Sequence, residues 1–161
     1  MSSGPGNTSE YTRFNLDRCT VTSRATEGEY VEYSCSGRGD AGLFAALGDG
    51  RMDLDAGVRN ERFEGLSAFN DIGAQIEWRL HGGVPVAIIF RYRDATPEGR
   101  AAGRSVLAVE KVGRPGAPGC RVAQLAGSTA QVNQRAREIA DRTAPGFPCG
   151  RGQVTYIGNS R

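Results

Sequence analysis

Residues 75–93, QIEWRLHGGVPVAIIFRYR, decide the fold because they hold two different strand patterns on either side of a Gly-Gly turn. In the first half, Ile76, Trp78 and Leu80 alternate with polar residues, which indicates a strand with one apolar face. In the second half, residues 86–90 are apolar without a break, which is typical of a strand covered on both faces. The sequence therefore predicts a β-hairpin whose second strand lies at the centre of the core.

This hairpin contains the chain's only tryptophan, Trp78, and its only histidine, His81. We predict that Trp78 is a core residue, because it lies on the apolar face of its strand. His81 falls in the turn and is expected to be solvated. A Ser-His-Asp triad needs a histidine as its base, and a histidine in a glycine turn does not suit that role.

A helical pattern follows near the C-terminus, in STAQVNQRAREIADRT, where apolar residues recur at helical spacing. We predict a helix near 129–143, with Ser128 as its N-cap and Gln131 completing a capping box. Pro145 is expected to stop the helix. The predicted core residues of the whole chain are Trp78, Val86, Ile88, Phe90 and Ile139.

The remaining segments are typical of short strands separated by turns, since 23 glycines are spread along the sequence. We predict an α+β fold that is mainly antiparallel β, a sandwich or strongly curved sheet of about eight to ten strands with one C-terminal helix. The length suggests a single domain, 11–161, after a flexible leader or cloning remnant over residues 1–10. Between residues 58 and 73 we predict a long loop that holds Leu66 and Phe69 against the core.

Four cysteines allow three disulfide pairings, and no C-x-x-C motif occurs. We favour Cys19 with Cys35, which would tie one hairpin, and Cys120 with Cys149, which would tie a strand to the segment after the helix. Disulfides indicate an oxidising compartment, so we expect a periplasmic or secreted protein whose signal peptide has been removed. Four free buried thiols in a cytosolic protein are the alternative.

The charge balance and the motifs imply no cofactor. A net charge of +2 does not indicate a nucleic-acid partner, and no apolar run is long enough to span a membrane. The glycine-rich stretches do not fit a nucleotide-binding motif, and one histidine cannot complete a Cys/His zinc site. A protein or small-molecule ligand remains possible, and the oligomeric state is not predicted.

Two short segments contain candidate binding residues. Asp53 and Asp55 lie on one face of a predicted strand with Arg51, so they could bind Ca²⁺ or act as a carboxylate pair. We favour a solvated strand face paired with arginines, and we assign no metal ligand and no catalytic residue. The segment SGRGD after Cys35 is a plausible contact loop. The candidate binding residues are Ser36, Arg38, Asp40, Asp49, Arg51 and Asp53.

Six segments, GDGRMDLDAG, SAFNDIGAQIEWRLHGGVPVAIIFRYR, SVLAVEKVG, GCRVA, NQRAREIADRTAPGFPCG and VTYIG, carry a family resemblance. From Gly48 onward, over about two thirds of the chain, they resemble small exported proteobacterial proteins of unknown function, a family with an FNxxGxxIEWR-type motif. The resemblance implies export and disulfides, and it implies no activity or cofactor. Gly50 stands where that family usually has a bulky residue. Ser36 and Gly37 are also similar to the Ser-Gly loop of periplasmic lysozyme inhibitors.

These observations predict a non-enzymatic, extracytoplasmic binding or interaction module. The first alternative is a proteinaceous inhibitor of a secreted or cell-wall hydrolase, and a rigid protruding loop at 36–40 or 48–51 would favour it. The second alternative is a carboxylate-based hydrolase, which a cleft lined by acidic groups of raised pKa would favour. A large apolar pocket would instead favour a binder of small ligands.

Overall fold

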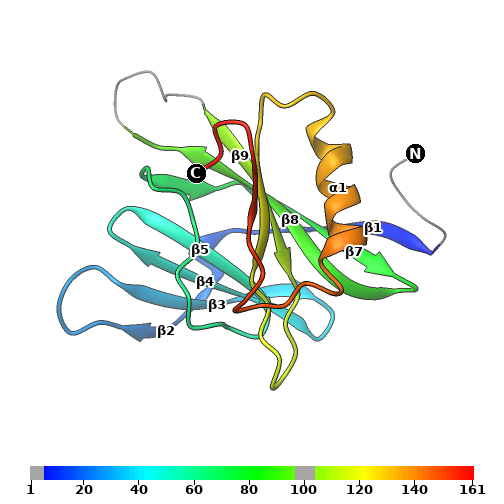
Figure 1. Ribbon diagram of the computed structural model, residues 1–161. Helices are drawn as coiled ribbons and strands as arrows, with labels where there is room; N and C mark the ends of the chain where they lie inside the picture. The colour runs from blue at the N-terminus through cyan, green and yellow to red at the C-terminus, as the bar shows by residue number, and fades with distance from the viewer. Residues whose placement is uncertain (1–5, 97–103) are drawn as a thin grey trace.

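The computed structural model describes residues 6–96 and 104–161. Eleven strands, a short 3₁₀ helix (Leu16–Arg18) and one α-helix, α1 (Val132–Thr143), form the fold (Figure 1). The strands are β1 (Asn7–Arg13), β2 (Thr20–Arg24), β3 (Val31–Arg38), β4 (Ala41–Gly48), β5 (Arg51–Gly57), β6 (Asn70–Ile72), β7 (Gln75–His81), β8 (Val84–Asp94), β9 (Ser105–Lys111), β10 (Arg121–Ala126) and β11 (Thr155–Ile157).

The strands form two sheets. The larger has the order β1-β7-β8-β9-β10-β11, with β6 also paired to β8, and the smaller has the order β2-β3-β4-β5. Neighbouring strands are antiparallel except for β10 and β11, which are parallel. One apolar cluster lies between the sheets, and a second lies between the large sheet and α1. The predicted class, mainly antiparallel β with a C-terminal helix, is confirmed.

Strand β8 is the central strand of the fold, as its apolar run predicts. Ile88 and Phe90 belong to the cluster between the sheets, whereas Ala87 and Ile89 belong to the cluster under α1. Trp78 on β7 is fully buried, and its indole Nε1 donates to Thr12 Oγ1 at 2.8 Å. Two further predicted core residues, Val86 and Ile139, are only partly buried and pack at the edge of the helix cluster.

Two disulfides connect the predicted pairs. Cys19 bonds to Cys35 on β3, with 4.5 Å between the Cα atoms. Cys120 precedes β10 and bonds to Cys149 beyond α1, with 5.7 Å between the Cα atoms. The first bond holds the start of β2 to β3, and the second holds the chain after the helix to the large sheet.

The predicted leader over residues 1–10 is wrong for its second half. Residues 7–10 belong to β1, which pairs antiparallel with β7 along its whole length, from Asn7 opposite His81 to Arg13 opposite Gln75. The polar composition of this segment suits an edge strand that has one neighbour and faces solvent. Residues 1–5 lie outside the described part of the chain.

The start of α1 also differs from the prediction. The helix begins at Val132, and its N-cap is Gln131 in a left-handed conformation rather than Ser128. Residues 127–131 form turns instead, in which Thr129 N donates to Ala126 O at 2.9 Å. The predicted end is confirmed, because the helix stops at Thr143, just before Pro145.

The connection between β5 and β6 carries a third difference. Leu66 is buried in the cluster between the sheets, as predicted. Phe69 is exposed instead, because its ring lies beside the β4–β5 turn and under the guanidinium of Arg51. Within the described residues, no helix has the length and apolar character needed to cross a membrane.

Candidate functional sites

The six candidate binding residues do not form one site. Ser36, Arg38 and Asp40 lie at the β3–β4 turn, whereas Asp49 and Arg51 lie at the β4–β5 turn. These turns are at opposite ends of β4, about 23 Å apart for an eight-residue strand. Asp53 lies in the buried part of β5, at neither turn. The structure therefore offers three separate places to consider.

The β3–β4 turn is held from two sides. Arg38 Nε donates to Glu10 Oε1 of β1 at 2.8 Å, and Cys35 is disulfide-bonded to Cys19. Gly37 fits closely against the next strand, since a Cβ at this position would lie 2.1 Å from Ala41 O. Arg38 is thus already paired within the molecule. Of the candidate residues at this turn, only Ser36 and Asp40 are exposed for contact with a partner.

The β4–β5 turn is rigid and is surrounded by aromatic rings. Asp49 and Gly50 both have positive φ, which is the conformation of a tight two-residue hairpin turn. Arg51 braces the turn, because it donates to Asp49 Oδ2 at 2.9 Å and to Ser67 O at 2.8 Å. Its guanidinium carbon lies 4.9 Å from the centre of the Phe69 ring.

Three aromatic side chains next to this turn remain in contact with solvent. Tyr30, Phe63 and Phe69 are 37%, 43% and 43% exposed, and the first two rings are 6.3 Å apart. Glycines at the turn make room for the rings, since a Cβ at Gly50 would lie 2.8 Å from the Phe69 ring. We call Tyr30, Phe63, Phe69 and Arg51 the aromatic surface. Sequence reasoning missed it because its members come from three segments without a shared pattern.

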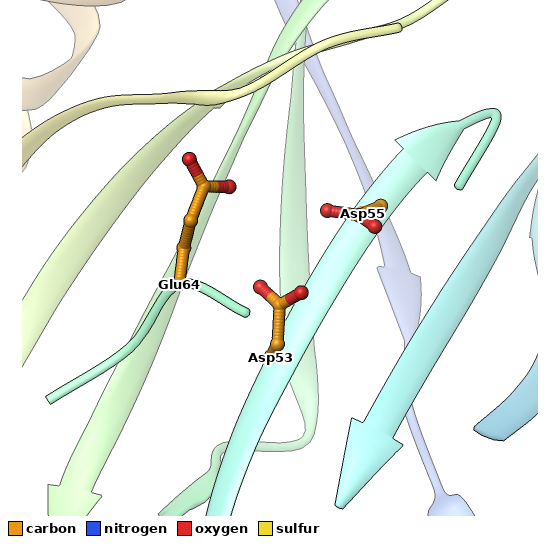
Figure 2. Close-up of side chains that lie close together, drawn as sticks. All are labelled: Asp53, Asp55 and Glu64. Atoms are coloured by element: carbon orange, nitrogen blue, oxygen red, sulfur yellow. The ribbon is translucent and has the colours of Figure 1, made fainter. Parts of the chain in front are cut away.

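The third place is a buried cluster of acidic groups. Asp53 and Asp55 on β5 and Glu64 on the following connection have carboxyl groups close together (Figure 2). One oxygen from each of the three lies within 4.8 Å of the others. Glu110 of β9 lies beside Asp55, and it is fully buried. We call Asp53, Asp55, Glu64 and Glu110 the carboxylate cluster.

Arg121 of β10 is the cation of this cluster. Its Nε donates to Glu110 Oε1 at 2.9 Å, and its Nη2 donates to Tyr92 Oη at 3.0 Å. Its Nη1 donates to the side chain of Gln124, while Asp53 Oδ1 stays 3.8 Å from Nη2. The guanidinium therefore satisfies one carboxylate directly and uses its other donors on neutral groups.

The prediction of a solvated face on β5 is wrong. Asp53 is 3% exposed and Asp55 is 2% exposed, because the 58–69 connection and strands β9 and β10 cover them. Asp55 accepts hydrogen bonds from Asn60 N at 3.0 Å and Asn60 Nδ2 at 2.9 Å. Apolar and polar residues do alternate along β5, but its polar face is buried against other polar groups instead of facing solvent.

Burial changes the acidity of the cluster. Desolvation, followed by the charge of Asp55, raises the pKa of Asp53 to about 8. Desolvation also raises the pKa of Asp55 to about 6, and it raises the pKa of Glu110 well above its usual range. Acidic groups of raised pKa are typical of hydrolase sites, but these carboxyl groups are closed off from a substrate-sized molecule.

A hollow of about 620 Å³ lies over the outer side of the cluster. Asn60 joins the two features, because its Nδ2 donates to Asp55 in the cluster and to Gly119 O at the rim of the hollow. The lining mixes charged and polar side chains with apolar groups, so the hollow is not the purely apolar pocket expected of a small-ligand binder. It includes Arg59, Asn60, Glu61, Arg62, Lys111, Gly119 and Phe147.

Comparisons with known proteins give no family. The chain matches no protein-family model, no curated protein and no solved structure.

Proposed function

We propose that this protein is a non-enzymatic, extracytoplasmic interaction module that binds a folded protein partner through the aromatic surface. The observation that carries the proposal is the grouping of three exposed aromatic rings and an arginine around a rigid turn. Aromatic and arginine side chains supply most of the binding energy at protein interfaces. They do so best when they are already held in place, as Arg51 holds Phe69 and as Tyr30 and Phe63 pack against each other beside the turn.

The position of the surface supports a partner with a concave binding site. The β4–β5 turn lies at the end of the small sheet that is farther from α1 (Figure 1). A hairpin end with exposed aromatic flanks fits into a groove better than it fits against a flat surface. This geometry also favours the first alternative, an inhibitor of a secreted or cell-wall hydrolase, because the cleft of such an enzyme is a groove of this kind.

Two disulfides support the extracytoplasmic part of the proposal, because such bonds persist in oxidising compartments. The proposed kinship with small exported proteobacterial proteins agrees with this location. The hydrolase alternative has less support. The carboxylate cluster does contain acidic groups of raised pKa, but a substrate has no open path to Asp53 or Asp55.

The test is affinity capture with matched variants, followed by measured binding to the purified partner. The variant Tyr30→Ser, Phe63→Ser, Phe69→Ser removes the aromatic surface. The control Val84→Ser, Tyr156→Ser removes exposed apolar groups on the large sheet. We expect a partner from the extracytoplasmic fraction that the wild type and the control retain. Its Kd should rise at least tenfold in the aromatic variant, for about 1.4 kcal/mol or more.

Equal binding of that partner by the aromatic variant and the wild type would contradict the proposal. The inhibitor alternative is tested in the same series by assaying cell-wall hydrolases with and without the protein. Inhibition that disappears in the aromatic variant would specify the partner as an enzyme. Hydrolysis of a substrate by the protein itself, lost in Asp53→Asn, would support the carboxylate enzyme instead.

A further inference from the structure

The carboxylate cluster contains more negative groups than the protein neutralises. Four carboxyl groups surround one guanidinium, so full ionisation would leave three negative charges without a positive partner. Buried charges of this kind are stable only when they are paired, protonated or bound to a metal ion. The described part of the chain offers Arg121 alone as a cation in contact with the cluster.

Two buried oxygens of the cluster also lack a hydrogen-bond partner. Asp53 Oδ1 and Glu110 Oε2 have none among the described residues, although both side chains are almost fully enclosed. The nearest cation to Asp53 Oδ1 is Arg121 Nη2, and the 3.8 Å between them exceeds a hydrogen bond. Such oxygens normally find a partner in a folded protein. The carboxyl group of Glu110 is in hydrogen-bond contact with Asp55, so Asp53 Oδ1 is the oxygen that points to a missing partner.

We propose that the carboxylate cluster is a binding site for one divalent cation of the calcium class, held by Asp53, Asp55 and Glu64. Ca²⁺ binds oxygen at about 2.3–2.6 Å, so two of its ligands lie at most about 5 Å apart. The three oxygens, one from each residue and all within 4.8 Å of one another, meet that condition. All the ligands are carboxylate oxygens, which Ca²⁺ prefers and softer metals do not.

The surroundings hold these ligands in place. Asn60 donates to both carboxyl oxygens of Asp55, and Arg121 N donates to Glu64 Oε2 at 3.0 Å. Each of these oxygens keeps a free lone pair for a metal. Glu64 is only partly buried and Asn60 borders the hollow, so the cluster comes nearest to solvent on this side, where a bound ion could keep some of its water ligands.

A cation site explains why β5 carries two buried carboxyl groups, whose burial costs free energy that apolar residues at the same positions would not cost. A cation between the carboxylates neutralises two of the three unpaired charges. It ties β5 of the small sheet to the 58–69 connection. Because this connection carries Phe63 and Phe69, the ion also fixes the base of the aromatic surface, although the cation proposal stands without that function.

The experiment is a titration of the whole protein with CaCl₂ at pH 7.5 after removal of metals with EDTA. Isothermal calorimetry is expected to show one site with a Kd of about 0.1–1 mM, the range of extracellular calcium modules. Calcium at 10 mM should then raise Tm by roughly 3–10 °C. Magnesium at the same concentration should raise Tm less, because it requires a smaller and more regular ligand shell.

Two variants and a control place the ion. Glu64→Gln keeps the shape of a partly exposed side chain and should weaken calcium binding at least tenfold, and Asp53→Asn should do the same. Glu61→Gln, on the same connection but outside the cluster, should bind calcium like the wild type. If Asp53→Asn fails to fold, Glu64→Gln decides the question by itself.

Two results would overturn the proposal. The first is a wild-type protein that takes up no calcium at 10 mM, which would mean that protons shared between the carboxyl groups, such as Asp55 and Glu110, neutralise the cluster. The second is calcium binding that Glu64→Gln leaves unchanged, which would place the ion elsewhere on the molecule.

Discussion

Strands β5 and β7 have the same alternating pattern, yet the molecule treats their polar faces differently. On β7, Glu77 is paired with Arg137 of α1 at 2.6 Å, and Arg79 with Asp141 of α1 at 2.6 Å. On β5, both buried polar residues, Asp53 and Asp55, are acidic, and both face the same cation of β10. One buried polar face is matched charge by charge, and the other is not.

The comparison shows that alternation does not by itself mean a wet face. The helix covers the polar face of β7, and the 58–69 connection covers that of β5. Ion pairs make the first face stable as it stands. The second face needs protons or a cation in addition to Arg121. The two faces should therefore respond differently to mutation, pH and salt.

The largest effect is expected for Arg121→Met. Among the described residues, the change removes the one cation in contact with the carboxylate cluster and leaves four acidic groups together, three of them buried. Removal of one partner from a buried ion pair costs about 3–5 kcal/mol, and we expect the upper end of that range. Urea unfolding at pH 7.5 measures the loss. A loss below about 1 kcal/mol would show that the cluster does not depend on this charge.

A smaller loss, about 3 kcal/mol, is expected for Arg79→Met, because only Asp141 then remains unpaired beneath the helix. The double variant Arg79→Met, Asp141→Leu should recover most of that stability, since replacing both partners by apolar groups is often neutral. Urea unfolding of the two variants gives the answer. Failure of the double variant to recover would mean that the pair also positions α1 in another way.

The pH dependence of stability distinguishes the two faces further. Since the pKa of Asp53 is raised to about 8, the folded state holds a proton that the unfolded state releases near pH 4. The free energy of unfolding should therefore fall as pH rises from about 4 to about 8, by at most ~1.4 kcal/mol per pH unit for this group. Asp53→Asn should flatten the curve, measured by urea unfolding in EDTA. A wild-type curve that rises over this range would contradict the burial argument.

The smallest effect is expected at the end of β7. His81 is exposed, and its only described polar contact is Nδ1 with Asn7 Oδ1 at 2.7 Å. His81→Ala should change the free energy of unfolding by less than ~0.5 kcal/mol. Thermal unfolding of the variant checks this value. A larger loss would show that β1 relies on this contact to remain on the sheet.

Local patterns predicted much of this fold correctly. The apolar run of β8 identifies the centre of the core, because only a strand covered on both faces lacks polar positions. The helix end before Pro145 and both disulfide pairs were predicted because they depend on a few neighbouring residues or on strand order. The helix start was not predicted correctly, because its N-cap residue, Gln131, has a left-handed backbone conformation and makes no side-chain capping hydrogen bond that a sequence motif would indicate.

The candidate sites were less predictable because they depend on packing between distant segments. The residue types Asp53 and Asp55 were noticed, but their partners Glu110 and Arg121 lie more than fifty residues away. The aromatic surface likewise joins Tyr30 to Phe63 and Phe69, which have no common spacing. The alternating pattern of a strand does not indicate whether a distant connection will cover its polar face.

The order of the large sheet has a consequence for how the chain is made and handled. Among the described residues, the main path of this sheet runs from β1 to β11, the first and the last strands in sequence order. A chain that is still being synthesised ends its sheet at β9 or β10, with an open edge that can pair with other chains. The edge of β10 is therefore covered only after β11 has been made and has paired with it. Removal of β11 should open the edge of β10, and it should also remove Ile157 from the helix cluster and the carbonyl of Ser160 from its hydrogen bond with Gln124 Nε2.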